Sequence, residues 1–325
     1  MFNRAVSRRL SLALGAFVLT TVMSGAMAQS GMVKLVVPVG PGSSGDSYAR
    51  FFSGKLGPMI GKSVVVDNRP GAETWLAVHA VLNAPPNGES ILLISPSSMI
   101  ITPMTNKSLQ YTPLKDIRPL ITYNRGDTVL VTAANSKFKT LRDVFDASRK
   151  KPGSVDVANY GMIYRLGLVD LEDRAKLKFN HVNYKSPGPA MTDALGGHLD
   201  LMLMDLGGAL PMIREGKFRP LATTGSKRSA DLPDTPTIGE SGVPGYVLNT
   251  WTGFGVRADT PEDVAVKLES ALLAIVQTPE FRSFNAANGN AEVTGLNRKQ
   301  VKAMVEAETA NFKRLLAIGG DDLNK

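Results

Sequence analysis

Short apolar segments rich in valine and isoleucine alternate along the chain with segments in which apolar residues recur every three or four positions. The first pattern predicts buried β-strands, and the second predicts helices with one apolar face. Strands are expected over residues 33–37, 64–66, 91–94, 129–131, 155–157 and 201–204. Repeated alternation of strand and helix is typical of parallel layers. The pattern therefore predicts an α/β fold.

Capping residues mark the ends of several expected helices. The first long helix is expected to begin near Asp46. Thr260 is placed to cap a helix whose first residue is Pro261. The last helix is expected to begin after Asn297 and to end at glycines 319 and 320.

The middle of the chain carries its own alternation of strands and helices. It is bracketed by two segments rich in turn-forming residues, 124–127 and 242–245. This arrangement predicts an inserted second domain that is joined to the first by two crossing strands.

The N-terminal residues have the pattern of a secretory signal peptide. Arg4, Arg8 and Arg9 precede an apolar run over 10–22, and Ala26-Met27-Ala28 is an A-x-A cleavage signal. The apolar run is too short to span a membrane, which takes about 20 residues. Residues 1–28 are therefore expected to be removed on export, by the general secretory route rather than the twin-arginine route, leaving a soluble protein.

Composition narrows the possible chemistry. The chain of 325 residues has no cysteine, which excludes disulfides, thiolate metal sites, a cysteine nucleophile and a lipid-attachment cysteine. Its net charge is +8, and three of these charges belong to the leader's arginines. The remaining charges are scattered. They suit a small anionic ligand or simply a solvated surface, and they give no reason to expect a nucleic-acid partner.

The segment 38–46, between the first strand and the first long helix, is rich in glycine and serine. Its glycines let the backbone approach a ligand closely, and the helix start supplies unpaired N–H groups and partial positive charge. These properties fit an anion-binding loop. An ordinary strand-to-helix turn capped by Asp46 would show the same residues, so both interpretations stand at this point.

Two segments resemble nucleotide-binding motifs, but neither matches its motif fully. Residues 57–63 look like a phosphate-binding loop but are one residue short, and they precede a strand instead of following one. The glycines at 40, 42 and 45 match a dinucleotide fingerprint only formally, since proline occupies the middle position. No cofactor is expected.

Catalytic and metal motifs are also missing from the sequence. His79, His181 and His198 are too far apart to form a metal motif, and there is no G-x-S-x-G nucleophile elbow. Residues 95–98, Ser-Pro-Ser-Ser after a strand, could carry a nucleophile, but hydroxyl donors or a simple turn explain them better. Neither a metal nor a catalytic residue is expected.

Five segments in a fixed order carry a resemblance to a known family: PVGPGSSGDSYAR, VVVDNRPGAE, APPNGESILLIS, HVNYKSPGPAMTDALGGHLDLMLMD and SKRSADLPDTPTIGESGVPGYVLNTWTGFGVRADTP. With these segments the chain resembles the Bug family, the periplasmic receptors of tripartite tricarboxylate transporters, over nearly its whole mature length. The resemblance implies a monomeric, two-lobed periplasmic binding protein of the Venus-flytrap, type II-like kind. It would close on a small carboxylate and deliver it to membrane transporter subunits without catalysing a reaction.

The resemblance also implies the lobes and the ligand loop. Lobe 1 would comprise residues 29–129 and 249–325, and lobe 2 residues 130–248, with crossing strands as the hinge. The ligand's carboxylate would be held by the loop after the first strand. The residues implied are Gly42, Ser43, Ser44, Gly45 and Asp46.

This chain departs from the family's pattern in two places. Glu73, Thr74 and Trp75 replace small residues and asparagine, and the second-lobe loop over 159–167 keeps only Gly161 of the usual residues. If Trp75 or Tyr164 stacks on the ligand and Arg165 pairs with a second carboxylate, the ligand is aromatic or a dicarboxylate. Alternatively, these side chains fill the wall of the cleft or the core, and the ligand is an ordinary one.

Two further residues are expected at the ligand site, and two other functions fit the same sequence. Ser97 is expected to offer a hydroxyl, and Asp205 is expected either to accept a hydrogen bond from the ligand or to cap the following turn. The alternatives in function are a hydrolase of small carboxylate esters, and a receptor that signals to a sensor kinase.

Overall fold

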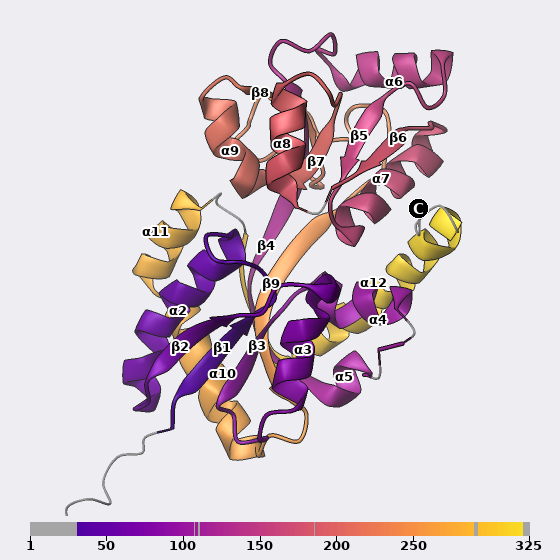
Figure 1. Ribbon diagram of the computed structural model, residues 1–325. Helices are drawn as coiled ribbons and strands as arrows, with labels where there is room; N and C mark the ends of the chain where they lie inside the picture. Colours follow the sequence, from indigo (N-terminus) through magenta and orange to yellow (C-terminus); the bar gives the residue numbers. More distant parts are fainter. Residues whose placement is uncertain (1–30, 107, 110, 185, 289–291, 321–325) are drawn as a thin grey trace, which may run out of the picture.

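The computed structural model describes residues 31–106, 108–109, 111–184, 186–288 and 292–320. The expected signal peptide lies outside these residues. The described chain forms two α/β lobes that are connected by two long strands (Figure 1).

Lobe 1 contains a mixed sheet with the strand order β10-β4-β9-β3-β1-β2. Strand β1 is parallel to β2 and β3, whereas β9 is antiparallel to β3 and β4. The strands are β1 (Val33–Val37), β2 (Val64–Asn68), β3 (Ser90–Ile94), β4 (Ile117–Ala133), β9 (Asn249–Arg257) and β10 (Glu292–Asn297). The helical segments of this lobe are α2 (Ser44–Ile60), η1 (Ala72–Thr74), α3 (Trp75–Leu82), η2 (Ser97–Ile101), α4 (Thr102–Thr105), α5 (Pro113–Asp116), α10 (Glu262–Val276) and α11 (Pro279–Ala287).

Lobe 2 is built on the far half of β4, which pairs there with β7 (Met202–Asp205) and β8 (Phe218–Thr223). A parallel pair, β5 (Asp156–Asn159) and β6 (Asn180–Asn183), lies beside them. Its helices are α6 (Leu141–Lys150), α7 (Met162–Ala175), α8 (Pro187–Leu195) and α9 (Leu206–Arg214). All six strands that the sequence predicts are present, and the α/β, two-lobed fold is confirmed.

The apolar face of α2 explains the packing of lobe 1. Tyr48, Phe52 and Leu56 are four residues apart, so they lie on one side of the helix, and all three are buried. Phe52 lies against Phe254 of β9 and Phe281 of α11, with ring centroids 4.9 and 5.5 Å apart. These contacts hold the start of α2, and the loop before it, in a fixed position on the sheet.

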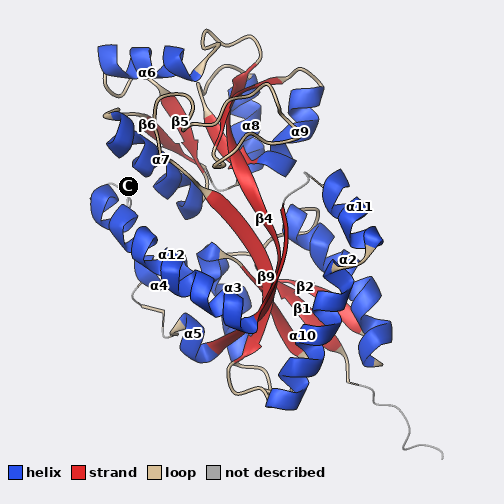
Figure 2. Ribbon diagram, turned by 180° about the vertical axis from the view of Figure 1, so that it is seen from behind, coloured by secondary structure: helices blue, strands red, loops and turns tan. Residues whose placement is uncertain are grey.

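The last helix, α12 (Arg298–Gly319), belongs to both lobes (Figure 2). It begins beside lobe 1 with the predicted capping box of Asn297, and Gly320 caps its other end, as predicted. Its C-terminal half packs on α7 of lobe 2, where Arg314 forms an ion pair of 2.7 Å with Asp170. Phe312 shares a buried cluster with Leu166 of α7.

The turn predicted over 124–127 is wrong, because these residues lie inside the unbroken strand β4. They have the side chains of a turn, but each finds a partner within the fold. Asn124 accepts a hydrogen bond from Thr252, Asp127 accepts one from Asn249, and Arg125 pairs with Glu308 of α12. These tertiary partners outweigh the local turn preference.

The predicted cap at Thr260 is also wrong. Helix α10 begins at Glu262 after Pro261, and the start has no side-chain cap. The Thr260 hydroxyl is buried without a hydrogen-bond partner in the described structure. Pro261 fixes the backbone one residue later than the sequence pattern suggested.

Candidate functional site

The C-terminal ends of β1, β2 and β3 meet at one edge of the lobe-1 sheet, because these strands are parallel. Three connections follow them: the loop that leads into α2, the turn η1 and the π-helical turn η2. Turn η2 contacts α7 of lobe 2. This edge of lobe 1 therefore faces the second lobe, where a two-lobed binding protein holds its ligand.

The loop before α2 is fixed by its own hydrogen bonds. Ser43 is the cap of α2, since its hydroxyl accepts from the backbone N–H of Asp46 at 3.3 Å and donates to the carbonyl of Gly40 at 2.7 Å. Gly42 has a φ of 79°, which favours glycine. The cap is thus Ser43 rather than Asp46, and the loop is held by hydrogen bonds within the protein.

The buried side chain of Asp46 holds this loop in place through hydrogen bonds. Its carboxylate is 3% exposed and accepts hydrogen bonds from the Gly42 N–H, from Asn68 and from Arg50 at 2.9 to 3.0 Å. The hydrogen bond from Arg50, with those from Gly42 and Asn68, holds the pKa of Asp46 below its ordinary value against the effect of burial. Asp46 is therefore an ionised group that shapes the loop before α2.

Two hydroxyls at this edge remain available to a ligand. No hydrogen-bond partner is found among the described residues for the side chain of Ser44, at the first turn of α2, or for that of Ser97, at the start of η2. Gly45 is partly exposed in the same helical turn. An added Cβ there would lie 3.0 Å from Val39, so the glycine allows close packing at the helix start.

The turn after β2 has an unusual backbone. Ala72, Glu73 and Thr74 have φ values of 45°, 49° and 81°, in the left-handed region that L-residues seldom adopt. The Glu73 carbonyl accepts a hydrogen bond of 2.6 Å from Thr102, which ties this turn to the helix after η2.

Trp75 follows that turn but packs within lobe 1. Its ring stacks on Tyr111 at 5.4 Å and lies 5.1 Å from His79. It lines a cavity of about 450 Å³ together with Leu82 of the same helix and Asn83, which follows that helix. This position supports the interpretation in which Trp75 fills a wall of its lobe.

The second-lobe edge is formed by the ends of β5 and β7. Tyr164 donates a hydrogen bond of 2.9 Å to Asp205, and its ring centroid lies 4.7 Å from that of Tyr160. Thr250, on the crossing strand β9, donates to the other oxygen of Asp205 at 3.4 Å. Gly161 precedes α7, and an added Cβ would meet the Tyr164 ring at 3.3 Å.

The chemistry of this edge is set by Asp205. Although it stands at the start of α9, its carboxylate makes no capping hydrogen bond, so the capping role considered from the sequence is wrong. Burial raises the pKa of Asp205 above its ordinary value, against the hydrogen bonds from Tyr164 and Thr250. Arg165, 7% exposed on α7, places a cationic group in the same lobe.

Sequence reasoning missed Tyr160 and Thr250. The signal that could have identified Thr250 is the run Asn249-Thr250-Trp251-Thr252, in which polar residues interrupt a buried strand. Tyr160 precedes the retained Gly161, and its hydroxyl donates to the Leu203 carbonyl at 2.7 Å.

No group of three or more histidine or acidic side chains within the described ranges is arranged to hold a metal ion. No helix in the described part of the chain is long and apolar enough to cross a membrane.

The fold and the two facing edges define a class of protein, the two-lobed periplasmic binding proteins. Two solved structures of that class are similar to this chain. The structure described as R. palustris Rpa4515 with adipate has a TM-score of 0.81 and 25% sequence identity, and the match covers 90% of this chain and 99% of that one. The periplasmic binding protein BugD has a TM-score of 0.77 and 27% sequence identity, and the match covers 88% of this chain and 96% of that one. Residues 49–320 match the family described as the tripartite tricarboxylate transporter family receptor, and the chain belongs to that family.

Relatives of similar length confirm the resemblance to the Bug family. The protein BugT of Bordetella pertussis is 29% identical over 264 residues, which are 80% of this chain and 81% of BugT. A UPF0065 protein of Pseudomonas sp. strain P51 is 31% identical over 248 residues, with 75% and 74% covered.

Proposed function

We propose that this chain is a periplasmic solute-binding protein that captures a small carboxylate between its lobes and delivers it, as a monomer, to the membrane subunits of a tripartite tricarboxylate transporter. One observation carries the proposal: a hydrogen-bonded loop and a helix start present N–H groups and the hydroxyls of Ser44 and Ser97 at the edge that faces lobe 2. The adipate in the R. palustris relative supports a carboxylate ligand.

We propose that residues 29–129 and 249–325 form lobe 1 and residues 130–248 form lobe 2. The pairing of β4 supports this division, since its partner changes from β9 to β7 between Asp127 and Thr128. Helix α12 then connects the two lobes instead of completing lobe 1 alone.

The positions of Trp75 in lobe 1 and of Tyr164 in lobe 2 favour an aliphatic ligand over an aromatic one. Trp75 is stacked on Tyr111, and the Tyr164 ring lies against Tyr160 while its hydroxyl is hydrogen-bonded to Asp205. These side chains are occupied within the protein and form a wall. Asp205 would accept a hydrogen bond from a ligand hydroxyl or amine, and Arg165 would pair with a second carboxylate.

A hydrolase is the less favoured function. Serine nucleophiles require a base within hydrogen-bond reach. Among the described residues, His79 contacts Asn83 and His181 contacts Glu172, and neither is hydrogen-bonded to a serine.

The test is thermal unfolding of the purified protein with a panel of aliphatic, hydroxylated and aromatic mono- and dicarboxylates. A ligand at 100 times its dissociation constant adds about 2.7 kcal/mol, which raises the melting temperature by roughly 5 °C. We expect the largest shift with an aliphatic dicarboxylate. A larger shift with aromatic acids would reverse the choice of ligand class, and no shift with any carboxylate would contradict the function.

Variants assign the effect to the loop. In the Ser44→Ala, Ser97→Ala double variant we expect affinity for the panel's best ligand to fall at least about tenfold, as the loss of hydrogen bonds to a charged group predicts. Ser53→Ala is the control, because Ser53 lies on the same helix but donates to the Val64 carbonyl. Equal affinity in both variants would remove the loop from the site.

A further inference from the structure

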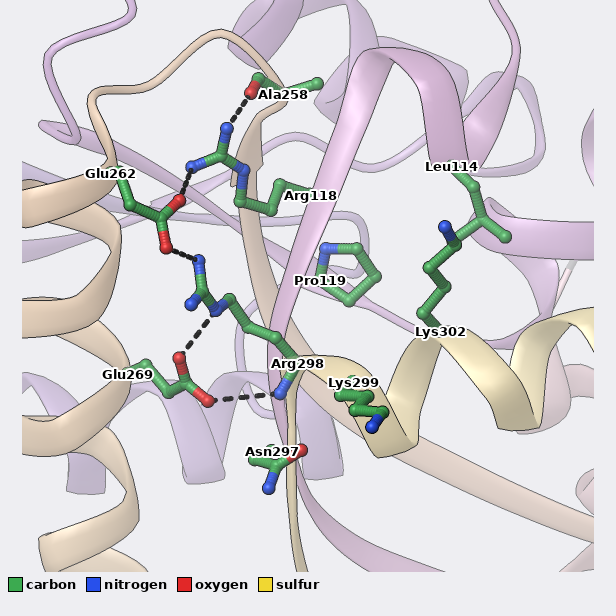
Figure 3. Close-up of a pocket in the computed structure, with 10 residues that line it drawn as sticks. All are labelled: Leu114, Arg118, Pro119, Ala258, Glu262, Glu269, Asn297, Arg298, Lys299 and Lys302. Atoms are coloured by element: carbon green, nitrogen blue, oxygen red, sulfur yellow. Dashed lines mark hydrogen bonds and ion pairs between the residues drawn. The ribbon is translucent and has the colours of Figure 1, made fainter.

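A second cavity lies on lobe 1, away from the edge that faces lobe 2. It has a volume of about 690 Å³, is largely open to solvent, and lies between α5, the first residues of β4, α10 and the start of α12 (Figure 3). Strand β4 enters lobe 2 only at its other end, where Thr128 pairs with β7. This cavity is therefore separate from the proposed carboxylate site.

One wall of the cavity is a row of ion-paired side chains in which arginines and glutamates alternate. Arg118 pairs with Glu262 at 3.1 Å, and Arg298 pairs with both Glu262 and Glu269 at 2.7 Å (Figure 3). Glu269 also accepts the backbone N–H of Arg298. Both acids of the wall are thus neutralised by arginines, which are held in fixed positions by the same contacts.

Two more cations of α12 line the cavity. Lys299 is exposed and has no ion pair with a described residue, and Lys302 reaches only Glu306, at 4.0 Å, where both side chains are more than half exposed. The cavity therefore has two positive charges in excess of its acids.

Arg298 and Lys299 stand where a helix disfavours cations. The N-terminal turn of a helix carries partial positive charge and usually holds acids, whereas α12 has none there and begins Arg298-Lys299. Such an arrangement costs stability in the free protein. A bound anion would offset both the excess charge and the helix dipole.

We propose that this cavity is a second ligand site, which binds a compact oxyanion with two or more negative charges, either a phosphate compound or a polycarboxylate. Lys299 and Lys302 supply the main attraction, and the fixed guanidinium groups of Arg118 and Arg298 form one side. Leu114 and Pro119 give the cavity an apolar surface that an organic anion would cover.

The test is calorimetric titration of the purified protein at low ionic strength with two probes, inorganic pyrophosphate and citrate. We expect saturable binding of at least one probe, and the tighter probe distinguishes phosphate from carboxylate chemistry. The Lys299→Gln, Lys302→Gln double variant should bind at least tenfold more weakly. Its melting temperature should be unchanged or higher, since Lys299 no longer places a cation at the positive end of the helix.

The control is Lys267→Gln, Lys313→Gln, which removes the same charge from exposed positions of α10 and α12. It should keep its affinity within twofold. Equal weakening in the two double variants, or no saturable binding of either probe, would overturn the proposal. Binding should persist in the Ser44→Ala, Ser97→Ala variant, which separates this site from the carboxylate site; loss there would also overturn it.

Discussion

Asp46 shows how one buried residue can fix the shape of the loop before α2 through hydrogen bonds to Gly42, Arg50 and Asn68. The sequence identified the glycine and serine loop and its aspartate, but not which side chain caps the helix. Serine and aspartate are both common caps. The choice depends on Asn68 and Arg50, whose positions beside Asp46 follow from the folded sheet and the helix together.

The Asp46→Asn variant should lose roughly 2 kcal/mol of stability at pH 7. Gly42 and Arg50 donate to one carboxylate oxygen and Asn68 to the other, and an amide nitrogen in place of either oxygen cannot accept the hydrogen bonds made there. The pKa of Asp46 is lowered in the folded protein. The stability it contributes is therefore present above its ordinary value of 3.8 and is lost as the pH falls through the lowered pKa.

The measurement is urea unfolding of the wild-type protein and of Asp46→Asn at pH values from 7 to 3. The difference between their free energies of unfolding should shrink as the pH falls. Asp146→Asn is the control, since Asp146 is exposed and its contact with Arg142 is 3.8 Å long. A difference between Asp46→Asn and wild type that is independent of pH would show that the carboxylate's charge is not the cause.

Among the elements, the strands and the long helices followed from the sequence, whereas several of their ends did not. Buried strands are marked by their apolar residues whatever surrounds them. The polar segment 124–127 looked like a turn because its partners, such as Thr252 and Glu308, are distant in sequence. The stacking of Trp75 on Tyr111 could not be predicted either, because these two residues are also distant in sequence.

The left-handed turn η1 is the element in which sequence and backbone disagree most. Glu73→Gly should raise stability by about 0.5–1 kcal/mol, because glycine adopts a φ of 49° without the steric cost of a side chain. Chemical denaturation would measure the change. Ala80→Gly, in the middle of α3, should instead lower stability by about 1 kcal/mol. Loss of stability in both variants would mean that the turn is not strained.

At the scale of the whole molecule, the two lobes share a buried cluster. It includes Leu92 of β3, Leu203 of β7 and Phe312 of α12, so burial of apolar surface couples the lobes. The sequence predicted two lobes and their crossing strands. It did not predict that α12 packs on both lobes, because the apolar face of an amphipathic helix does not indicate which surface of the protein it will cover.

This shared core predicts that the protein unfolds in one transition. In differential scanning calorimetry we expect a single peak in which the calorimetric and van't Hoff enthalpies agree. Phe312→Ala should shift the whole peak to lower temperature. Two separate peaks in the wild-type protein would show that the lobes unfold independently.

The path of α12 bears on how the lobes can move. Two adjacent strands alone would allow lobe 2 both to swing towards lobe 1 and to rotate about the strand direction. A helix fixed to lobe 1 at Arg298 and to lobe 2 at Arg314 acts as a strut of constant length beside that hinge. It would oppose the rotation more than the swing, so that any closing movement of the lobes would follow one direction and bring the same two edges together.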